Sequence, residues 1–328
     1  MAASADTTSS ISPTTQPEGH AYPDLSESPA TIASRGNEIT GLKIFQKTDL
    51  DNDIAPSRVA ELMAELIADK PTGGREISYG EKDAQHLRFW KANPKSHQAP
   101  TIVFVHGGSW RIGTNLDSVG SVKGYAFASV NYTLVPVIQV EEQVQEIAHA
   151  ISFLLKNAAS LDIDSERVIL MGHSSGAHVV TLLGTDTNYL TRAGVDIHVV
   201  RGVVSIDGSN YNAPAELLDS PGPVVENLIH ALGTDPDRLR AISPTYHARA
   251  PNAAAFLLLH AHRQGDVRQA VELAAALHAS GTKVDLRVFE GEGFEGHVRM
   301  LLRLGDPSYP ATLVLEDWLR LHLPVSLT

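Results

Sequence analysis

A serine set between glycines is the strongest chemical signal in the sequence. Residues 172–176 read GHSSG and match the G-x-S-x-G pattern, in which a sharp turn from strand to helix exposes the serine hydroxyl. The apolar run RVILM at 167–171 predicts the strand, and residues 175–183 predict the helix. The turn crowds the residues two before and two after the serine, and glycine relieves that crowding. We therefore predict that Ser174 is a nucleophile; the alternative is a glycine-rich turn without chemistry.

A second glycine-rich stretch supplies donors for the charge that such a nucleophile creates. HGGSW at 106–110 directly follows the apolar run TIVFV. Attack on a carbonyl places negative charge on its oxygen, and each preorganised backbone N–H group stabilises that charge by roughly 3–4 kcal/mol. We predict an oxyanion hole formed by the N–H groups of Gly107 or Gly108 together with that of Ser175. The alternative is an ordinary turn at the end of a strand.

A histidine in a glycine-flanked loop is the predicted general base. For a nucleophile on this kind of turn, the chain order is serine, acid and histidine, each after a strand. His297 lies in GEGFEGHVRM, just beyond the predicted strand at 284–289. His260 and His262, at the end of the preceding strand, are weaker alternatives. The histidines that we expect to have structural roles are His106, His173 and His178.

The predicted acid is Asp266, which follows the apolar run AFLLLH and directly precedes a predicted helix. Its carboxylate would hold His297 in the required tautomer and stabilise the imidazolium. Asp207, at the end of the strand before, is the rival, and we interpret it as a turn residue. No H-E-x-x-H motif is present, and the pair of histidines at 260 and 262 is interpreted as structural. We therefore expect neither a metal nor a cofactor.

Alternating strands and helices must position these residues. Apolar runs predict strands at 101–108, 125–131, 167–171, 199–206, 255–260 and 284–289, and residues 75–91 predict a hairpin. Helices are predicted at 55–69, 139–156, 175–183, 267–279, 298–304 and 311–322. Such alternation is typical of the α/β class, with a mostly parallel sheet and helices on both faces. Ligands of such sheets bind beyond the carboxyl ends of the strands, where the motifs fall.

Two segments differ from this pattern. Residues 1–38 are rich in Ser, Thr and Pro and are predicted to be a disordered tail, which leaves residues 39–328 as one domain. Residues 208–250 are rich in Pro and polar residues, and we read them as an irregular stretch that forms a small lid over the substrate. Tyr211 of this lid is expected to contact the substrate. The alternative is a surface excursion without contact.

The composition excludes several classes of protein. The net charge is −12, which disfavours a nucleic-acid or anionic-membrane surface, and no apolar run is long enough to span a membrane. The chain has no Cys, which excludes a thiol nucleophile, disulfides and Cys-bound metals. The tail lacks the basic and apolar regions of a signal peptide, so we expect a cytoplasmic location. The expected partner is a small-molecule substrate, and a homodimer remains open.

On these motifs, residues 98–325 resemble the α/β-hydrolase superfamily and, within it, the hormone-sensitive-lipase-like branch. HGGSW is similar to the HGGxW loop of kynurenine formamidases, also called arylformamidases, and GHSSGAH is similar to their GHSxGAH turn. YTLVP at 132–136 resembles the Y-R-L-x-P stretch of the branch, with Thr133 in place of Arg. The resemblance gives Ser174, Asp266 and His297 the triad positions. HAHRQGD around Asp266 departs from the usual H-G-x-x-D.

The resemblance implies hydrolysis of N-formyl-L-kynurenine to L-kynurenine and formate. The alternative is a carboxylesterase that acts on a small-molecule ester, as in secondary metabolism. A ligand-binding protein that has lost catalysis is a third reading, disfavoured because all three triad positions are filled. Trp110 is expected to narrow the acyl pocket, where it stacks on the substrate or else pins its own loop. The other expected substrate contacts are Ser109 and Tyr132.

Overall fold

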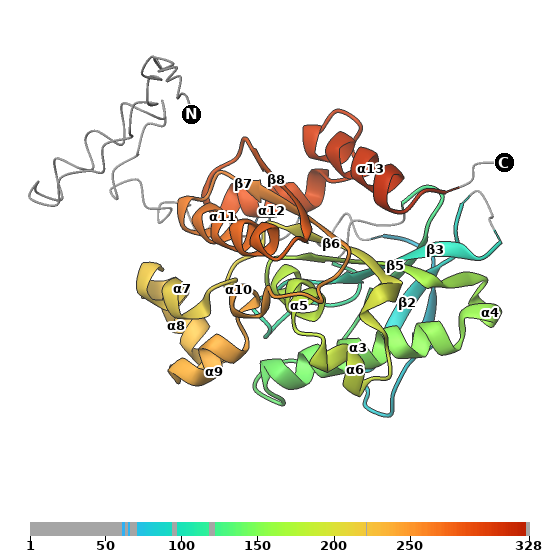
Figure 1. The fold of residues 1–328 in the computed structure, drawn as a ribbon, viewed down its shortest axis with the longest axis horizontal. Helices are drawn as coiled ribbons and strands as arrows, with labels where there is room; N and C mark the ends of the chain where they lie inside the picture. The colour runs from blue at the N-terminus through green and yellow to red at the C-terminus, as the bar shows by residue number, and fades with distance from the viewer. Residues whose placement is uncertain are drawn as a thin grey trace, which may run out of the picture. The chain divides into compact units, whose positions relative to one another are not determined.

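An eight-stranded, mostly parallel sheet forms the centre of the computed structural model (Figure 1). The model describes residues 61, 62, 65, 71–93, 97–117, 122–220 and 222–325. The strand order is β1-β2-β4-β3-β5-β6-β7-β8. The first three strands in this order pair antiparallel, and all later neighbours pair parallel. The α/β-hydrolase fold that the sequence predicts is therefore confirmed.

The strands fall where the apolar runs predict them. They are β1 (Arg75–Ser78), β2 (His86–Trp90), β3 (Ala99–Val105), β4 (Ala126–Val130), β5 (Ile163–His173), β6 (Val200–Ile206), β7 (Ala255–Ala261) and β8 (Lys283–Phe289). The predicted hairpin at 75–91 is the pair β1 and β2. The main departure is β5, which begins four residues before the predicted strand.

The helices predicted from residue 139 onward are also found, and the main departure is the helix that contains His297, which begins five residues before its predicted start at 298. They are α3 (Val140–Lys156), α5 (Ser175–Thr185), α11 (Gln264–Ala279), α12 (Gly293–Arg303) and α13 (Pro310–His322). Shorter elements are α4 (Ala158–Leu161), α6 (Asn188–Arg192) and the 3₁₀ turn η1 (Ile197–Val199). The predicted helix at 55–69 lies almost entirely outside the described residues, as does the predicted tail. None of the helices in the described part of the chain combines the length and apolarity that a membrane crossing requires.

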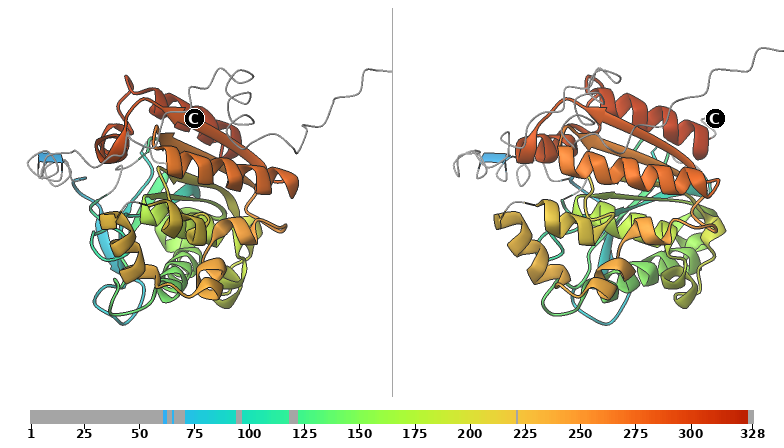
Figure 2. Two further views of the ribbon diagram at one scale, coloured as in Figure 1. Left: turned by 90° about the vertical axis from the view of Figure 1, so that its left-hand side faces the viewer. Right: turned by 60° about the vertical axis from the view of Figure 1, so that its left-hand side comes forward.

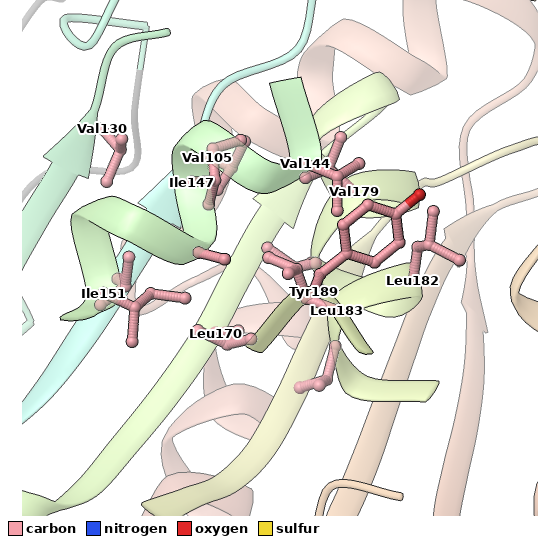
Figure 3. Packing of buried hydrophobic residues seen from close by; sticks show 14 of the residues in the cluster. Val105, Val130, Val144, Ile147, Ile151, Leu170, Val179, Leu182, Leu183 and Tyr189 are labelled. Atoms are coloured by element: carbon pink, nitrogen blue, oxygen red, sulfur yellow. The ribbon is translucent and has the colours of Figure 1, made fainter. Parts of the chain in front are cut away.

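The two faces of the sheet bury two separate hydrophobic clusters. Side chains alternate along a strand, so Val103 and Val105 of β3 join one cluster while Phe104 joins the other. Helices α3, α5 and α11 pack on the first face, and Figure 3 shows α3 and α5 side chains there. Helices α12 and α13 cover the second face (Figure 2). Because both faces are covered, the central strands are rich in apolar residues, and β3 is buried along its whole length.

Residues 208–250 are helical where the sequence predicts an irregular stretch. They form α7 (Ala213–Asp219), α8 (Gly222–Leu232), α9 (Pro236–Ala241) and α10 (Pro244–His247). Contacts with α3 and with the loop after β3 are among those that join this segment to the rest of the fold. Arg238 of α9 pairs with Glu141 of α3 at 2.7 Å, and Arg111 donates to Asn227 of α8 at 3.1 Å. The second contact connects the segment to the loop that follows β3.

Candidate active site

Ser174 lies on the sharp turn between β5 and α5 that the sequence predicts. Its backbone has φ 56° and ψ −124°, a conformation that is strained for a residue with a side chain. The flanking glycines allow the turn to close. A methyl group on Gly172 would collide with the carbonyl oxygen of Gly176, and one on Gly176 would collide with that of Val105. The backbone of Ser174 therefore remains strained, while glycine on both sides avoids the collisions that side chains there would cause.

The loop after β3 lies directly against this turn. A Cβ added to Gly107 would lie 2.9 Å from the Cβ of Ser174, so the backbone passes the serine closely. Gly108, Ser109 and Trp110 all have positive φ, of 115°, 52° and 61°. The carbonyl of Gly108 accepts from two later backbone N–H groups, which closes the loop into a tight turn. Trp110 N donates to Ser175 Oγ at 3.2 Å and joins the loop to α5.

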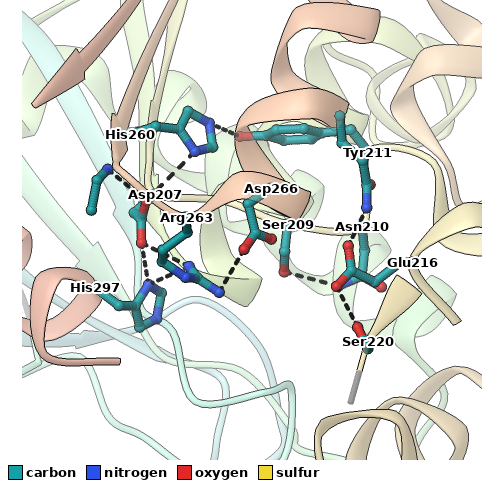
Figure 4. A network of polar contacts seen from close by, with 12 residues as sticks. Asp207, Ser209, Asn210, Tyr211, Glu216, Ser220, His260, Arg263, Asp266 and His297 are labelled. Atoms are coloured by element: carbon teal, nitrogen blue, oxygen red, sulfur yellow. Dashed lines mark hydrogen bonds and ion pairs between the residues drawn. The ribbon is translucent and has the colours of Figure 1, made fainter. Parts of the chain in front are cut away.

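His297 reaches the turn from the first helical residues of α12 rather than from an open loop. Its ring contacts that of His173, the residue before Ser174, with 4.5 Å between centroids and 31° between the ring planes. The side chain is 12% exposed, and Nδ1 donates to Asp207 Oδ2 at 2.6 Å (Figure 4). Asp207 follows β6, is fully buried and has φ 45°. The structure therefore pairs His297 with a carboxylate from the end of β6.

This pairing corrects the predicted acid. Asp266 lies in the first turn of α11, where its Oδ2 pairs with Arg263 Nη2 at 2.7 Å. Arg263 stands between the two carboxylates, because its Nη1 lies 2.7 Å from Asp207 Oδ2 (Figure 4). Asp207 is the rival acid that its position at the end of a strand suggests, and its interpretation as a turn residue is incomplete, because its carboxylate contacts His297. The carboxyl end of β6, not that of β7, supplies the partner of His297.

The surroundings of Asp207 keep it ionised. Burial alone raises the pKa of a carboxyl group, but the Arg263 guanidinium and the hydrogen bonds from His260 and His297 hold the pKa of Asp207 well below its usual range. Its Oδ1 also accepts from the backbone N–H of Ala261 at 2.9 Å. A buried negative charge therefore lies 2.6 Å from the imidazole that would become positive during proton transfer.

The histidine itself is kept neutral. Burial lowers the pKa of His297, the nearby Arg263 charge lowers it further, and the hydrogen bond to Asp207 acts in the opposite direction. A neutral imidazole is the form that accepts a proton from a hydroxyl group. Burial also lowers the pKa of His173 to about 3, so this neighbour is neutral as well. Its Nε2 donates to the backbone oxygen of His297 at 3.1 Å, which fixes the position of α12.

Three of the four expected substrate contacts are instead structural. Tyr132 is fully buried, stacks on His106 and donates to its carbonyl oxygen at 3.0 Å. Tyr211 is also fully buried, with its hydroxyl 2.6 Å from Ser205 Oγ. Trp110 is buried against the edge of His178, and therefore pins its loop. These side chains have almost no exposed surface through which a substrate could contact them.

The fourth expected contact, Ser109, is exposed at the tip of the same loop and remains a candidate. Two apolar side chains near the site are exposed too. Ile112, later in that loop, is 59% exposed, and Phe294, whose ring centroid lies 6.1 Å from that of His297, is 38% exposed. Apolar surface next to a polar centre is typical of a site that receives an apolar group.

Arg263 is the site residue that sequence reasoning missed. It lies between β7 and α11, in the stretch where HAHRQGD replaces the expected H-G-x-x-D. This departure from the family pattern was the available signal, because it places an arginine between the end of β7 and the predicted acid, Asp266. His260 also belongs to the network, since its Nδ1 lies 3.5 Å from Asp207 Oδ1 and its Nε2 lies 3.3 Å from the Tyr211 hydroxyl.

Several curated proteins are similar to part of this chain. A probable isoprenylcysteine alpha-carbonyl methylesterase of Oryza sativa is 30% identical over 32% of the chain and 26% of its own length. A kynurenine formamidase of Meyerozyma guilliermondii is 31% identical over 35% of the chain and 43% of its own length. Esterase LipC of Mycobacterium tuberculosis is 24% identical over 64% of the chain and 55% of its own length. The matches thus span between a quarter and just over half of these relatives.

Solved structures share the fold over most of the chain. Esterase B from Lactobacillus rhamnosis superposes with a TM-score of 0.63 at 17% identity, over 81% of this chain and 90% of the esterase. An esterase from Thermogutta terrifontis superposes with a TM-score of 0.59 at 21% identity, over 78% of this chain and 95% of the esterase. The BD-FAE family model matches residues 89–277, more than half of the chain, and includes the loop after β3 and the Ser174 turn. The chain therefore belongs to the BD-FAE family of α/β-hydrolases.

Proposed function

We propose that the chain is a serine hydrolase that transfers a small acyl group to water, with Ser174 as nucleophile, His297 as general base and Asp207 as the acid. The observation that carries the proposal is the buried contact of Asp207 with His297 at 2.6 Å, beside a serine on a strained turn. A serine is a weak nucleophile until an adjacent base takes its proton, and the base works best when a third group orients it.

In the first half of the reaction, Ser174 Oγ attacks the carbonyl carbon of the substrate and His297 Nε2 takes its proton. The carbonyl oxygen becomes negative and accepts hydrogen bonds from the backbone N–H groups of Gly107 or Gly108 and of Ser175. Collapse of this intermediate breaks the bond to the leaving group, which takes the proton from His297. An acyl group remains bound to Ser174.

In the second half, His297 takes a proton from water and the resulting hydroxide attacks the acyl carbon. The same backbone groups stabilise the second oxyanion. The bond to Ser174 then breaks, and Oγ recovers its proton from His297. Each cycle consumes one water and releases the acid and the leaving group, with the protein groups returned to their starting state.

A neutral ester with an apolar portion is the substrate class that the site supports best. Arg263 is the cation nearest to His297, and both of its terminal nitrogens are engaged by carboxylates. It is therefore poorly suited to bind the carboxylate of an amino-acid substrate. The exposed side chains of Ile112 and Phe294 favour an apolar group at the mouth of the site. Residues 208–250, joined to this loop through Arg111, would form the lid.

N-formyl-L-kynurenine is the second candidate substrate. The HGGSW loop and the similarity to kynurenine formamidases of Drosophila melanogaster and Meyerozyma guilliermondii support it. The leaving group would be an aniline nitrogen, and the acyl group a formyl. The mechanism would be unchanged.

One set of rate measurements tests both candidates. We would compare kcat/KM for p-nitrophenyl acetate, p-nitrophenyl butyrate and N-formyl-L-kynurenine, each beside Ser174→Ala. We expect rapid ester cleavage, lost in the variant, with slower turnover of the formamide. A strong preference for the formamide would instead assign the chain to the second candidate. Ester cleavage that survives in Ser174→Ala would contradict the proposed nucleophile.

A further inference from the structure

Two positively charged or potentially positive groups share one oxygen of the Asp207 carboxylate. His297 Nδ1 lies 2.6 Å from Oδ2 and Arg263 Nη1 lies 2.7 Å from the same atom. The two nitrogens are 3.0 Å apart. Since Nδ1 and Nη1 both donate to Oδ2, neither binds the other, and their closeness is a direct consequence of the shared acceptor.

The Arg263 guanidinium disfavours the positive charge that His297 acquires during catalysis. When His297 accepts a proton, an imidazolium forms about one hydrogen-bond length from a permanent cation, and like charges at this distance disfavour the charged form. Asp266 limits the effect, because its Oδ2 lies 2.7 Å from Arg263 Nη2 on the side away from His297. Although burial lowers the pKa of Arg263, Asp266 and Asp207 raise it, so the guanidinium keeps its charge.

We infer that Arg263 is a positioning residue that fixes Asp207 beside His297 and keeps the imidazole unprotonated, while Asp266 pairs with the guanidinium and moderates its effect. The inference rests on the proposed function, because it assigns His297 the role of base. Its functional consequence is that hydrolysis continues at a lower pH than it would without Arg263, since the base is active only in its neutral form.

The charged and titratable groups that surround His297 come from every element packed against it, and Arg263 is the permanent cation among them. His297 itself belongs to α12. The groups are His173 from β5, Asp207 after β6, His260 from β7, Arg263 between β7 and α11, and Asp266 from α11. Burial and Arg263 both lower the pKa of His297, in that order, and the hydrogen bond to Asp207 raises it.

The test measures how the acid limb of the pH profile depends on the charge of Arg263. We would record kcat/KM for p-nitrophenyl acetate against pH, together with the rate at which a fluorophosphonate labels Ser174. In Arg263→Gln, we expect the midpoint of both profiles to rise by about one pH unit. Arg263→Lys retains the charge and should return the midpoint most of the way. Arg268→Gln is the matched control, since Arg268 is a surface arginine of α11 that pairs with Asp219.

Replacement of Asp266 should shift the midpoint of the pH profile in the opposite direction. In Asp266→Asn the guanidinium loses its second counter-ion, so the midpoint should fall below that of the unmodified protein. A role in folding alone would not move the two midpoints in opposite directions. If Arg263→Gln fails to fold, the double variant Arg263→Gln with Asp266→Asn removes both charges and should still show the upward shift.

The outcomes separate this inference from the function on which it rests. An unchanged midpoint in Arg263→Gln or in the double variant, with Ser174 still labelled, would overturn the role of Arg263 and leave the hydrolase proposal intact. A shift of equal size in Arg268→Gln would also overturn it, because any lost cation would then have the same effect. Ester cleavage and labelling that persist in Ser174→Ala would overturn the proposed function instead.

Discussion

The carboxylate of Asp207 accepts hydrogen bonds from three groups in two segments of the chain. Ala261 N binds Oδ1, while His297 and Arg263 bind Oδ2. A buried carboxylate without such partners would cost several kcal/mol, so these contacts are required for the charge to persist in the fold. Asp266 provides a comparison, because it is also a buried aspartate and also pairs with Arg263.

Replacement of the two aspartates by asparagine distinguishes their roles. In Asp207→Asn, the amide no longer fixes the productive tautomer of His297, and we expect kcat to fall by about three to four orders of magnitude. Asp266→Asn should keep activity well above that of Asp207→Asn at its optimal pH. Steady-state rates and thermal unfolding of both variants check this prediction. Equal losses in the two variants would contradict the assignment of Asp207.

Gly107 lies where the loop after β3 passes close to Ser174, the proposed nucleophile. In Gly107→Ala the new methyl group would lie 2.9 Å from both the Cβ of Ser174 and the carbonyl oxygen of His173. The loop must move away, and we expect kcat to fall by about 100-fold or more as an oxyanion donor is displaced. Gly265→Ala is the control, since its methyl would meet no atom within 4 Å. Full activity in Gly107→Ala would argue against an oxyanion hole at this loop.

At the scale of elements, long apolar runs were sufficient to predict the sheet. Strands such as β3 and β7 are buried on both faces, so nearly all of their residues are apolar and the run is easy to recognise. The helices α7, α9 and α10 were missed because they contain only 4 to 7 residues, too few for a helical period to stand out. Helix α8 has 11 residues and was missed because the Pro-rich and polar stretch around it was interpreted as irregular.

The choice between the two acids could not be made from the chain order. Asp207 and Asp266 both follow apolar strands, and the sequence gives no distance from either to His297. That distance depends on how α12 lies over the ends of β6 and β7. It also depends on Arg263, which binds both carboxylates and occupies the space beside Asp266. The turn at Ser174 was predictable because its glycines are local to it. The partner of His297 was not, because Asp207 is 90 residues away in the chain.

The packing of α5 on the sheet leaves no room for a side chain at Gly184. Gly184 lies near the end of α5, and a Cβ there would be 2.6 Å from Val203 Cγ2 and 3.0 Å from Phe256 Cζ. Gly184→Ala must therefore push α5 away from β6 and β7, and we expect the free energy of unfolding to fall by about 1–3 kcal/mol. Urea denaturation measures this loss. Gly265→Ala again serves as control, and unaltered stability of Gly184→Ala would show that the helix adjusts freely.

For the whole molecule, buried histidines link stability to pH. Of the 15 histidines in the chain, the structure shows His106, His173, His178 and His260 as buried. His178 lies within the fold at α5, where Nε2 donates to the carbonyl oxygen of Ile242 at 2.7 Å and the ring meets the edge of Trp110. It therefore connects the loop after β3 to the segment between α9 and α10. Burial lowers the pKa of His178 to about 4.

The sign of the pH dependence follows from that depressed value. An unfolded histidine has a pKa of about 6.5, so between about pH 6.5 and pH 4 the unfolded chain binds a proton that native His178 does not. Stability from His178 is thus fully present above pH 6.5 and falls by about 1.4 kcal/mol per pH unit as the pH drops through this window. His173, with its pKa lowered to about 3, acts in the same direction. Asp207 loses its contribution only below about pH 4, the unfolded value for Asp.

Urea unfolding at pH 7, 6 and 5, at constant ionic strength, tests this dependence. We expect the unmodified protein to lose stability steadily over this range. His178→Gln retains an N–H donor toward Ile242 but cannot become charged, so its slope should be shallower by about 1.4 kcal/mol per pH unit. His198→Gln removes a surface histidine whose side chain is 84% exposed, and it should retain the slope of the unmodified protein. If His178→Gln and His198→Gln give the same slope, the buried imidazole is not the group that makes the fold sensitive to acid.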